Sequence, residues 1–321
     1  MREVVTPNQP PACAESICTL FEGDYHFGLA AFINSLVRAG YSGTVWIGYR
    51  GALPPWIHQL KRLDPQGREY MVADQVRLVF LLLKTTIHFT SYKPQFMLDL
   101  LQDQARECSH LWYFDPDIFL RCTWSYFSNW QRYGVALCQE IVMNAFPESS
   151  PLRHKWMEVA AGIGLDRPRA LNHYFNGGMV GLSAAHASFL DLWNRFIQLG
   201  EAAGGDIQQI QSGTRENTFC IPDQDALNMA AMYTEHPLSE MGPEAMGFET
   251  GGFTMYHTTG AKPWRGSLLW RALAGWPPTN AFRFFFTQVS SPIEAYSPWR
   301  LRGKKLSCAI ATLIGRVYRR Y

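Results

Sequence analysis

Apolar residues run without polar alternation through short stretches of the chain, at residues 16–21, 44–49 and 111–114. A strand without alternation is typical of the middle of a parallel sheet, where helices cover both faces. Between the first two stretches, apolar residues recur at helical spacing over residues 29–38, and Gly40 follows them. This spacing predicts a helix that ends at the glycine. The pattern therefore predicts β-α-β connections and an α/β fold with a mainly parallel central sheet flanked by helices.

Later stretches extend this pattern. Residues 76–84 are almost continuously apolar, which fits either a strand or a buried helix. Lys93 and Pro94 begin a predicted helix that runs through Arg106, because proline is favoured in the first turn of a helix. Further helices are predicted at 124–132, 151–161 and 222–232, and further strands at 134–138 and 174–182. The sequence contains no internal repeat and no linker long enough to divide it, so we expect residues 15–290 to form one domain.

Two carboxylates follow the apolar stretch 111–114. Asp115 and Asp117 flank Pro116, and apolar residues resume directly afterwards. In an open α/β sheet, ligands bind in the crevice at the carboxyl ends of the strands. Pro116 fixes one backbone angle between the two acids. Two oxygen ligands presented in this way suit Mn²⁺ or Mg²⁺, with positions left for substrate oxygens. The alternative is an acidic turn after a strand.

The loop after the first strand, Glu22-Gly23-Asp24-Tyr25, is expected at the same edge of the sheet. Tyr25 is suited to stack on a nucleotide base, and Glu22 or Asp24 to accept hydrogen bonds from a base or a ribose. An ordinary polar loop is the alternative. At residues 176–178, an Asn and two Gly enter an apolar strand. This pattern indicates either the close approach of a ligand or a β-bulge.

Two more polar clusters lie nearer the C-terminus. Asp223, Gln224 and Asp225 open the helix predicted at 222–232, where Asp225 is also suited to be a helix cap. His257 and Lys262 lie on a glycine-containing loop. They suit one metal contact and one phosphate contact, whereas a lone loop histidine is more commonly a surface residue.

These polar clusters form one ordered set between residues 17 and 264. After the aromatic-acidic loop, the set comprises Asp115-x-Asp117, Phe175-Asn176-Gly177-Gly178, Asp223-Gln224-Asp225-x-Leu227-Asn228 and His257-x-x-Gly260-x-Lys262-Pro263-Trp264. The set resembles the retaining GT-A glycosyltransferases of family 8, the family of glycogenin and of bacterial lipopolysaccharide galactosyltransferases. The resemblance implies a GT-A (Rossmann-like) nucleotide-diphospho-sugar transferase fold, in which the donor is usually a UDP-sugar.

The resemblance also implies a role for each matched residue. Asp115, Asp117 and His257 would hold Mn²⁺ or Mg²⁺, and Asp223 and Gln224 would be the catalytic pair that faces the reacting carbon and the acceptor. The donor would be contacted by Glu22, Asp24, Tyr25, Asp115, Asn176, Gly177, Gly260 and Lys262. The sequence departs from the family at two places. The histidine motif is one residue shorter than the common form H-x-x-G-x-x-K-P-W, and Gly178 stands where a small apolar residue or valine is usual.

The implied reaction moves a sugar from a nucleotide-sugar to a saccharide or glycolipid acceptor with retention of anomeric configuration. A divalent cation together with Lys262 would stabilise the negative charge on the departing diphosphate. Same-face attack is favoured because Gln224 is a poor nucleophile, whereas Asp223 keeps a covalent route open. Two further hypotheses are a non-catalytic sugar-nucleotide-binding protein of the same fold and a metal-dependent sugar-nucleotide hydrolase.

The composition of the chain indicates where the protein is located and which classes of partner it can bind. The chain has 321 residues, of which 47% are apolar and 17% charged, as expected of an ordered globular protein. Its net charge of +2 gives no basis for nucleic-acid binding. Seven cysteines without a C-x-x-C pair favour a reducing compartment. Residues 1–14 lack a hydrophobic signal core, and no apolar run is long enough to span a membrane. The expected location is the cytoplasm.

Residues 291–321 are predicted to form a basic amphipathic tail. An apolar stretch at 306–314 is flanked by Arg300, Arg302, Lys304, Lys305, Arg316, Arg319 and Arg320. Such a segment is typical of proteins that bind a membrane surface, and the alternative is a last helix packed on the domain with solvated basic ends. Attachment to the inner face of a membrane would suit a lipid-linked acceptor.

Overall fold

The fold is that of a computed structural model, which describes residues 15–141, 143 and 145–318. The predictions made for residues 1–14, and for Arg319 and Arg320 in the basic tail, lie outside the described residues.

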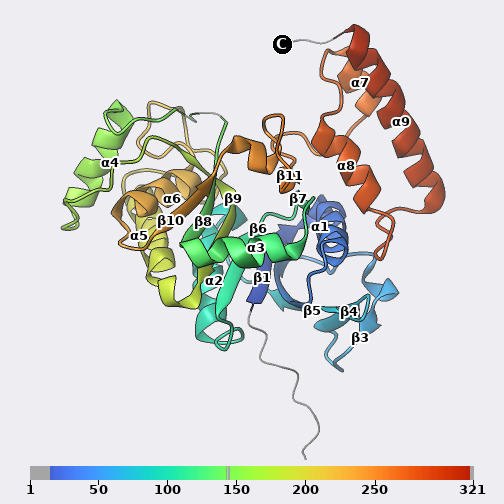
Figure 1. Cartoon of the computed structure of the whole chain (residues 1–321), viewed down its shortest axis with the longest axis horizontal. Coiled ribbons are helices and arrows are strands. Elements are labelled where there is room, and N and C mark those ends of the chain that lie inside the picture. The colour runs from blue at the N-terminus through green and yellow to red at the C-terminus, as the bar shows by residue number, and fades with distance from the viewer. Residues whose placement is uncertain (1–14, 142, 144, 319–321) are drawn as a thin grey trace, which may run out of the picture.

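One large sheet runs through the centre of the molecule (Figure 1). Within the described residues its strand order is β10-β8-β9-β6-β1-β2-β5-β4-β3. β9 and β4 run antiparallel to their neighbours, and the other strands share one direction. This mainly parallel sheet confirms the predicted fold class. The strands are β1 (Glu15–Glu22), β2 (Gly43–Arg50), β3 (Lys61–Arg62), β4 (Glu69–Val72), β5 (Val76–Leu82), β6 (His110–Phe114), β8 (Val135–Gln139), β9 (Phe175–Ser183) and β10 (Leu238–Met241).

Helices bury both faces of the central strands, which explains the absence of polar alternation in their sequences. Successive strand residues point to opposite faces. Ile17 and Trp112 accordingly lie in a hydrophobic cluster with residues of α1 and α3. Cys18 and Tyr113 lie in another cluster with residues of α2, α4, α5 and α6. The helices are α1 (His26–Arg38), α2 (Phe89–Gln102), α3 (Trp124–Trp130), α4 (Pro151–Ala161), α5 (Ser188–Ala202), α6 (Pro222–Tyr233), α7 (Leu268–Leu273), α8 (Asn280–Gln288) and α9 (Pro298–Val317).

Helix α2 begins a turn earlier than the sequence predicts. His88 is its N-cap, and the His88 side chain accepts a hydrogen bond of 3.3 Å from the backbone N–H of Thr90. Lys93 and Pro94 therefore lie inside the helix rather than at its start. The helix also ends at Gln102, before the predicted end at Arg106. Lys93 is buried at its position inside the helix.

Two other stretches are settled by the structure. Residues 76–84, left open between strand and helix, form strand β5 and its end. Helix α5 has no counterpart among the predicted elements, although Phe189, Trp193 and Phe196 are buried at helical spacing along it.

The apolar residues that follow the two acids belong to a second, two-stranded sheet. β7 (Ile118–Leu120) pairs in antiparallel fashion with β11 (Met255–His257), and Ile118 lies opposite His257. The short sheet thus ties two segments that are far apart in the sequence.

The last three helices pack together beside α1 at one end of the molecule (Figure 1). Phe285 of α8 and Leu301 of α9 share a hydrophobic cluster with Trp264 and with Phe119 of β7. The basic tail is therefore a helix packed by one side on the domain, and the proposed division at residue 290 stays a prediction. None of the helices in the described residues combines the length and apolarity that crossing a bilayer requires.

Candidate functional site

The carboxyl ends of β1 and β6 bring the predicted acidic groups to one edge of the sheet. β1 pairs in parallel with both β6 and β2, and its last residue, Glu22, lies opposite Arg50. After β6 the chain turns at Asp115. The Asp115 N–H donates to the carbonyl of Gly178 (2.7 Å), and its carbonyl accepts from the N–H of Ile118 (3.0 Å). These bonds fix the turn that presents Asp115 and Asp117.

Asp115, Asp117 and His257 converge at this turn. Nε2 of His257 is 3.8 Å from a carboxylate oxygen of Asp115 and 3.5 Å from one of Asp117. One ligand atom from each residue lies within 4.8 Å of the other two. Two carboxylate oxygens and an imidazole nitrogen are a donor set that fits Mn²⁺ or Mg²⁺. The pairing of β11 with β7 supplies the histidine, as the ordered motifs imply.

Lys262 lies beside the same carboxylates. Its Nζ donates to Oδ2 of Asp117 (2.5 Å) and to the carbonyl of Thr258 (2.7 Å). Burial alone would raise the pKa of the Asp117 carboxyl, but the charges of Lys262 and His257 hold that pKa well below its usual range. The shorter histidine motif therefore still brings the lysine ammonium into contact with an acid of the cluster.

Lys93 is a site residue that the sequence analysis does not identify. Its side chain is only 2% exposed, and its Nζ lies 3.2 Å from Asp115 Oδ1 and 3.4 Å from Asp223 Oδ2. It also donates to the carbonyl of Gly177 (2.9 Å). Burial alone would lower the pKa of the lysine, yet the two carboxylates raise that pKa above its usual value. Lys93 is thus a buried cation that joins Asp115 to Asp223.

The first turn of α6 supplies Asp223 and Gln224. The Asp223 carbonyl accepts from Nε1 of Trp193 (2.8 Å), and Oε1 of Gln224 accepts from the Gly177 N–H (3.0 Å). Burial raises the pKa of the Asp223 carboxyl above its usual value, although Lys93 counteracts this effect. Both side chains are therefore held close to the glycine pair of β9.

Asn176 is held by a neighbouring carboxylate. Its Nδ2 donates to Glu140 (2.5 Å), and its Oδ1 accepts from the Gly178 N–H (2.8 Å). Glu140 stands at the end of β8 and, like Lys93, was not identified from the sequence. A signal existed for the lysine, because it precedes the apolar residues Phe96 and Met97 by three and four positions and so shares their buried helix side.

The aromatic-acidic loop forms the other end of the site. The Tyr25 ring packs edge-on against Trp264, with centroids 5.6 Å apart. Glu22 is ion-paired with Arg50 (3.0 Å). Asp24 is held by Arg265, whose Nε lies 2.6 Å from Oδ2 of the acid. Arginines missed by the sequence analysis therefore neutralise both predicted acids.

A cavity of about 580 Å³ joins these groups. Of the predicted site residues, its walls contain Glu22, Tyr25, Asp115, Asp117, Asn176, Gly177, Asp223, Gln224, His257, Gly260 and Lys262. Asp24 is not among the described residues that line it; its partner Arg265 is. The cavity therefore brings together residues from five separate segments of the chain.

Asp225 supports the backbone before α6 and is not among the described residues that line the cavity. Its Oδ2 accepts from the backbone N–H groups of Cys220 (2.7 Å) and Ile221 (2.8 Å), just before α6. Its Oδ1 accepts from the Tyr174 hydroxyl (2.6 Å). The side chain satisfies backbone donors at the start of the helix. Asp225 is nevertheless not the cap that the sequence offered as an alternative, because Ile221 is the N-cap and Asp225 lies inside the first turn.

The departure at Gly178 is explained by the imidazole beside it. A Cβ at Gly178 would lie 2.6 Å from Cε1 of His257 and 2.8 Å from Oδ1 of Asn176. Contacts below 3.0 Å require one of the groups to move, so only glycine leaves room for the histidine in this position.

We expect Gly178→Ala to weaken Mn²⁺ binding by about tenfold or more, the size of effect seen when the support of a metal-ligating side chain is lost. Calorimetric titration of the chain with Mn²⁺ checks this. Gly303→Ala is the matched control, because a Cβ there meets nothing within 4 Å. Equal Mn²⁺ affinity of the Gly178 variant and the unmodified chain would show that the imidazole does not need its present position.

Comparison with solved structures finds the same fold, whereas no protein-family model and no curated protein sequence matches the chain. The chain is similar to the bifunctional glycosyltransferase WbbM in its apo form, with a TM-score of 0.53 and 14% identity. That match covers 93% of this chain and 53% of WbbM, so the chain spans about half the length of WbbM.

The galactosyltransferase LgtC is a second match. Its complex with donor and acceptor sugar analogues has a TM-score of 0.51 and 16% identity, over 90% of this chain and 99% of LgtC. An active-site mutant of LgtC matches with a TM-score of 0.50. These likenesses, together with the mainly parallel sheet, show that the chain has the GT-A glycosyltransferase fold, as the resemblance of its motifs to family 8 implied.

Proposed function

We propose that this protein is a metal-dependent glycosyltransferase that moves a sugar from a UDP-sugar to a saccharide or glycolipid acceptor with retention of configuration. Because one fold serves many functions, the fold alone does not carry this proposal. The observation that carries it is the Asp115–Asp117–His257 cluster, which shares one cavity with Lys262 and with the buried carboxylate of Asp223.

The acidic cluster would hold Mn²⁺ or Mg²⁺, which, when bound, acts as a Lewis acid on the departing diphosphate. The Lys262 ammonium would add a second positive charge beside the diphosphate. In the structure it neutralises Asp117, and with donor bound it would pair instead with the diphosphate, because the metal then neutralises the acid. The left-handed backbone of Gly260 (φ +69°) permits the tight turn that leads to this lysine.

The nucleoside would lie at the Tyr25 end of the cavity. Tyr25 would stack on uracil, as the resemblance implies. Glu22 would face the nucleoside itself, because it lines the cavity while paired with Arg50. Asp24 would act there through Arg265, because its carboxylate is already paired with that arginine. Arg265 lines the cavity and so replaces Asp24 as the group that faces the donor.

The sugar would lie between the glycine pair of β9 and the first turn of α6. Asn176 and Gly177 would line it, and Asp223 and Gln224 would face the reacting carbon. Same-face attack is the route we favour, with a donor phosphate oxygen taking the proton of the acceptor. The second route is a covalent sugar on Asp223, a carboxylate that could act as the nucleophile. The Lys93 ammonium holds this buried carboxylate in place.

The proposed location is the cytoplasm. Cys18, Cys138 and Cys220 are free and buried, and free thiols throughout a chain are typical of a reducing compartment.

The test is a panel of sugar nucleotides offered with Mn²⁺, in which binding and the slow release of free nucleotide are measured. We expect one UDP-sugar to bind and to be cleaved, faster when a saccharide acceptor is added. Cleavage at the same rate with every acceptor would instead indicate a hydrolase. Binding without any cleavage would indicate a non-catalytic protein.

His257→Ala should weaken Mn²⁺ binding in the presence of UDP by at least about tenfold, because one of three protein ligands is lost. Manganese electron paramagnetic resonance measures the free ion directly. His154→Ala, at an exposed position on α4, is the matched control. If His257→Ala bound the ion as tightly as the unmodified chain, the imidazole would have no place in the metal site.

A further inference from the structure

Helix α9 has two apolar sides, and the described residues cover only one of them. Leu301, Cys308 and Ala311 are buried against the preceding helices. The other side carries Leu306, Ile310, Leu313 and Val317, whose spacing of four, three and four residues places them in one line. Leu306 is 63% exposed, Leu313 55% and Val317 92%. We call this line the outer stripe.

Positive charge surrounds the outer stripe. From Ser297 to the end, the sequence contains seven of the 29 Lys and Arg and none of the 27 Asp and Glu. Residues 1–296 therefore carry 22 cations and 27 anions, a net charge of −5. Arg302, Lys305 and Arg316 are exposed beside the stripe. The positive charge of the sequence is thus concentrated in the segment whose described part forms α9.

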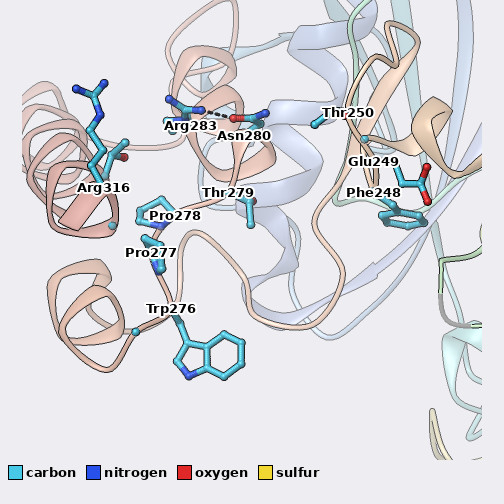
Figure 2. Close-up of a pocket in the computed structure, with 14 residues that line it drawn as sticks. Phe248, Glu249, Thr250, Trp276, Pro277, Pro278, Thr279, Asn280, Arg283 and Arg316 are labelled. Carbon is cyan, nitrogen blue, oxygen red and sulfur yellow. Dashed lines mark hydrogen bonds between the residues drawn. The ribbon is translucent and has the colours of Figure 1, made fainter. Parts of the chain in front are cut away.

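Exposed tryptophans lie at both ends of α9. Trp299 belongs to its first turn. At the other end, a Cβ on Gly315 would lie 2.3 Å from the Pro277 side chain, so the loop that carries the exposed Trp276 touches the helix there. Figure 2 shows Trp276, Pro277 and Arg316 around a cavity of about 520 Å³ beside α8. Tryptophan is the residue that favours the interface between lipid and water.

We propose that α9 docks the protein onto the surface of an anionic phospholipid bilayer. The outer stripe would enter the boundary between headgroups and acyl chains, with the cations at the level of the lipid phosphates. The positive charge of the α9 segment favours an anionic bilayer over a second copy of the chain as the partner of the outer stripe. A symmetric dimer through α9 would bring two such positive segments together, whereas an anionic bilayer attracts one.

This docking goes beyond the proposed transferase activity and does not depend on it. The negative charge of residues 1–296 is repelled by the same lipids, so the surface that meets the bilayer is fixed by the charge distribution.

The test is flotation of the full chain with vesicles, made either from phosphatidylcholine and phosphatidylglycerol in equal parts or from phosphatidylcholine alone. We expect binding to the mixed vesicles that falls in high salt. The double variant Leu306→Ser and Leu313→Ser should lose most of it. The double variant Arg302→Gln and Lys305→Gln should weaken it by about fivefold for each cation removed.

The controls are Leu82→Ser and Lys61→Gln, at exposed positions of β5 and β3, which should bind like the unmodified chain. All replaced side chains are exposed, and circular dichroism confirms folding. Vesicle binding that survives the Leu306 and Leu313 replacements would overturn the proposal. A dimer seen by light scattering that these replacements dissociate, with no vesicle binding, would overturn it in favour of a second copy.

Discussion

Replacement of Asp117 by Asn should lower sugar transfer by a factor on the order of 10² or more, as for the loss of an electrostatic contact made in the transition state. The Asp117 side chain is 3% exposed, and Oδ1 lies 3.5 Å from Nε2 of His257. An amide in its place removes a negative charge where a divalent cation would bind. Turnover with saturating donor and Mn²⁺ measures the loss.

Folding has to be followed in the same variant, because Asp117 also pairs with the buried Lys262. The free energy of unfolding separates a destabilised chain from a folded, inactive one. Asp191→Asn on the exposed side of α5 is the matched control and should keep full transfer. Unchanged transfer by folded Asp117→Asn would remove the metal from the mechanism.

Lys93→Met should lower the free energy of unfolding by about 3 kcal/mol or more, which is the usual cost of removing one partner from a buried ion pair. The ammonium lies between Asp115 and Asp223, and its removal leaves the two carboxylates close together without a cation between them. The pKa of Asp223, which burial already raises, should then rise further. Urea denaturation at neutral pH measures the change in stability.

Sugar transfer by Lys93→Met should fall as well, since Asp223, which we propose to face the reacting carbon, loses its support. Lys84→Met removes an exposed lysine and should change neither stability nor transfer. Lys93→Arg keeps the charge and should recover part of both. A Lys93→Met chain as stable as the unmodified one would show that the two acids tolerate each other in a protonated form.

The core of the fold could be predicted because its signal is local. Residues 16–21 and 111–114 are mostly apolar and buried, with Ser16 and Thr19 as the buried polar exceptions. Ile17 and Cys18 indeed point into clusters on opposite faces of the sheet. Helix α5 was missed although its spacing is regular. The start of α2 was misplaced because Pro94 suggested a first turn, whereas the cap that decides it is the His88 side chain.

The site could be predicted only where a motif marks it. Asp115 and Asp117 stand out because they follow an apolar strand, and His257 stands out only as the first residue of an ordered motif. The structure brings the three together. Lys93, Arg265 and Glu140 belong to none of these motifs. Their importance arises from partners on other segments, such as Asp24 for Arg265 and Asn176 for Glu140. Pairing between distant side chains is a property of the folded chain that a single sequence does not display.

The pairing of β7 with β11 determines when, during synthesis of the chain, the residues of the candidate metal site can come together. Each of these strands is three residues long, and Lys262, beyond β11, lies 145 residues after its partner Asp117. Chains emerge from the ribosome amino end first. A nascent chain can therefore assemble β1, β2, β5 and β6 while it still lacks the imidazole. Affinity for the proposed metal ion should appear late in biosynthesis, and that ion, once bound, would hold the early and late halves of the chain together by mass action.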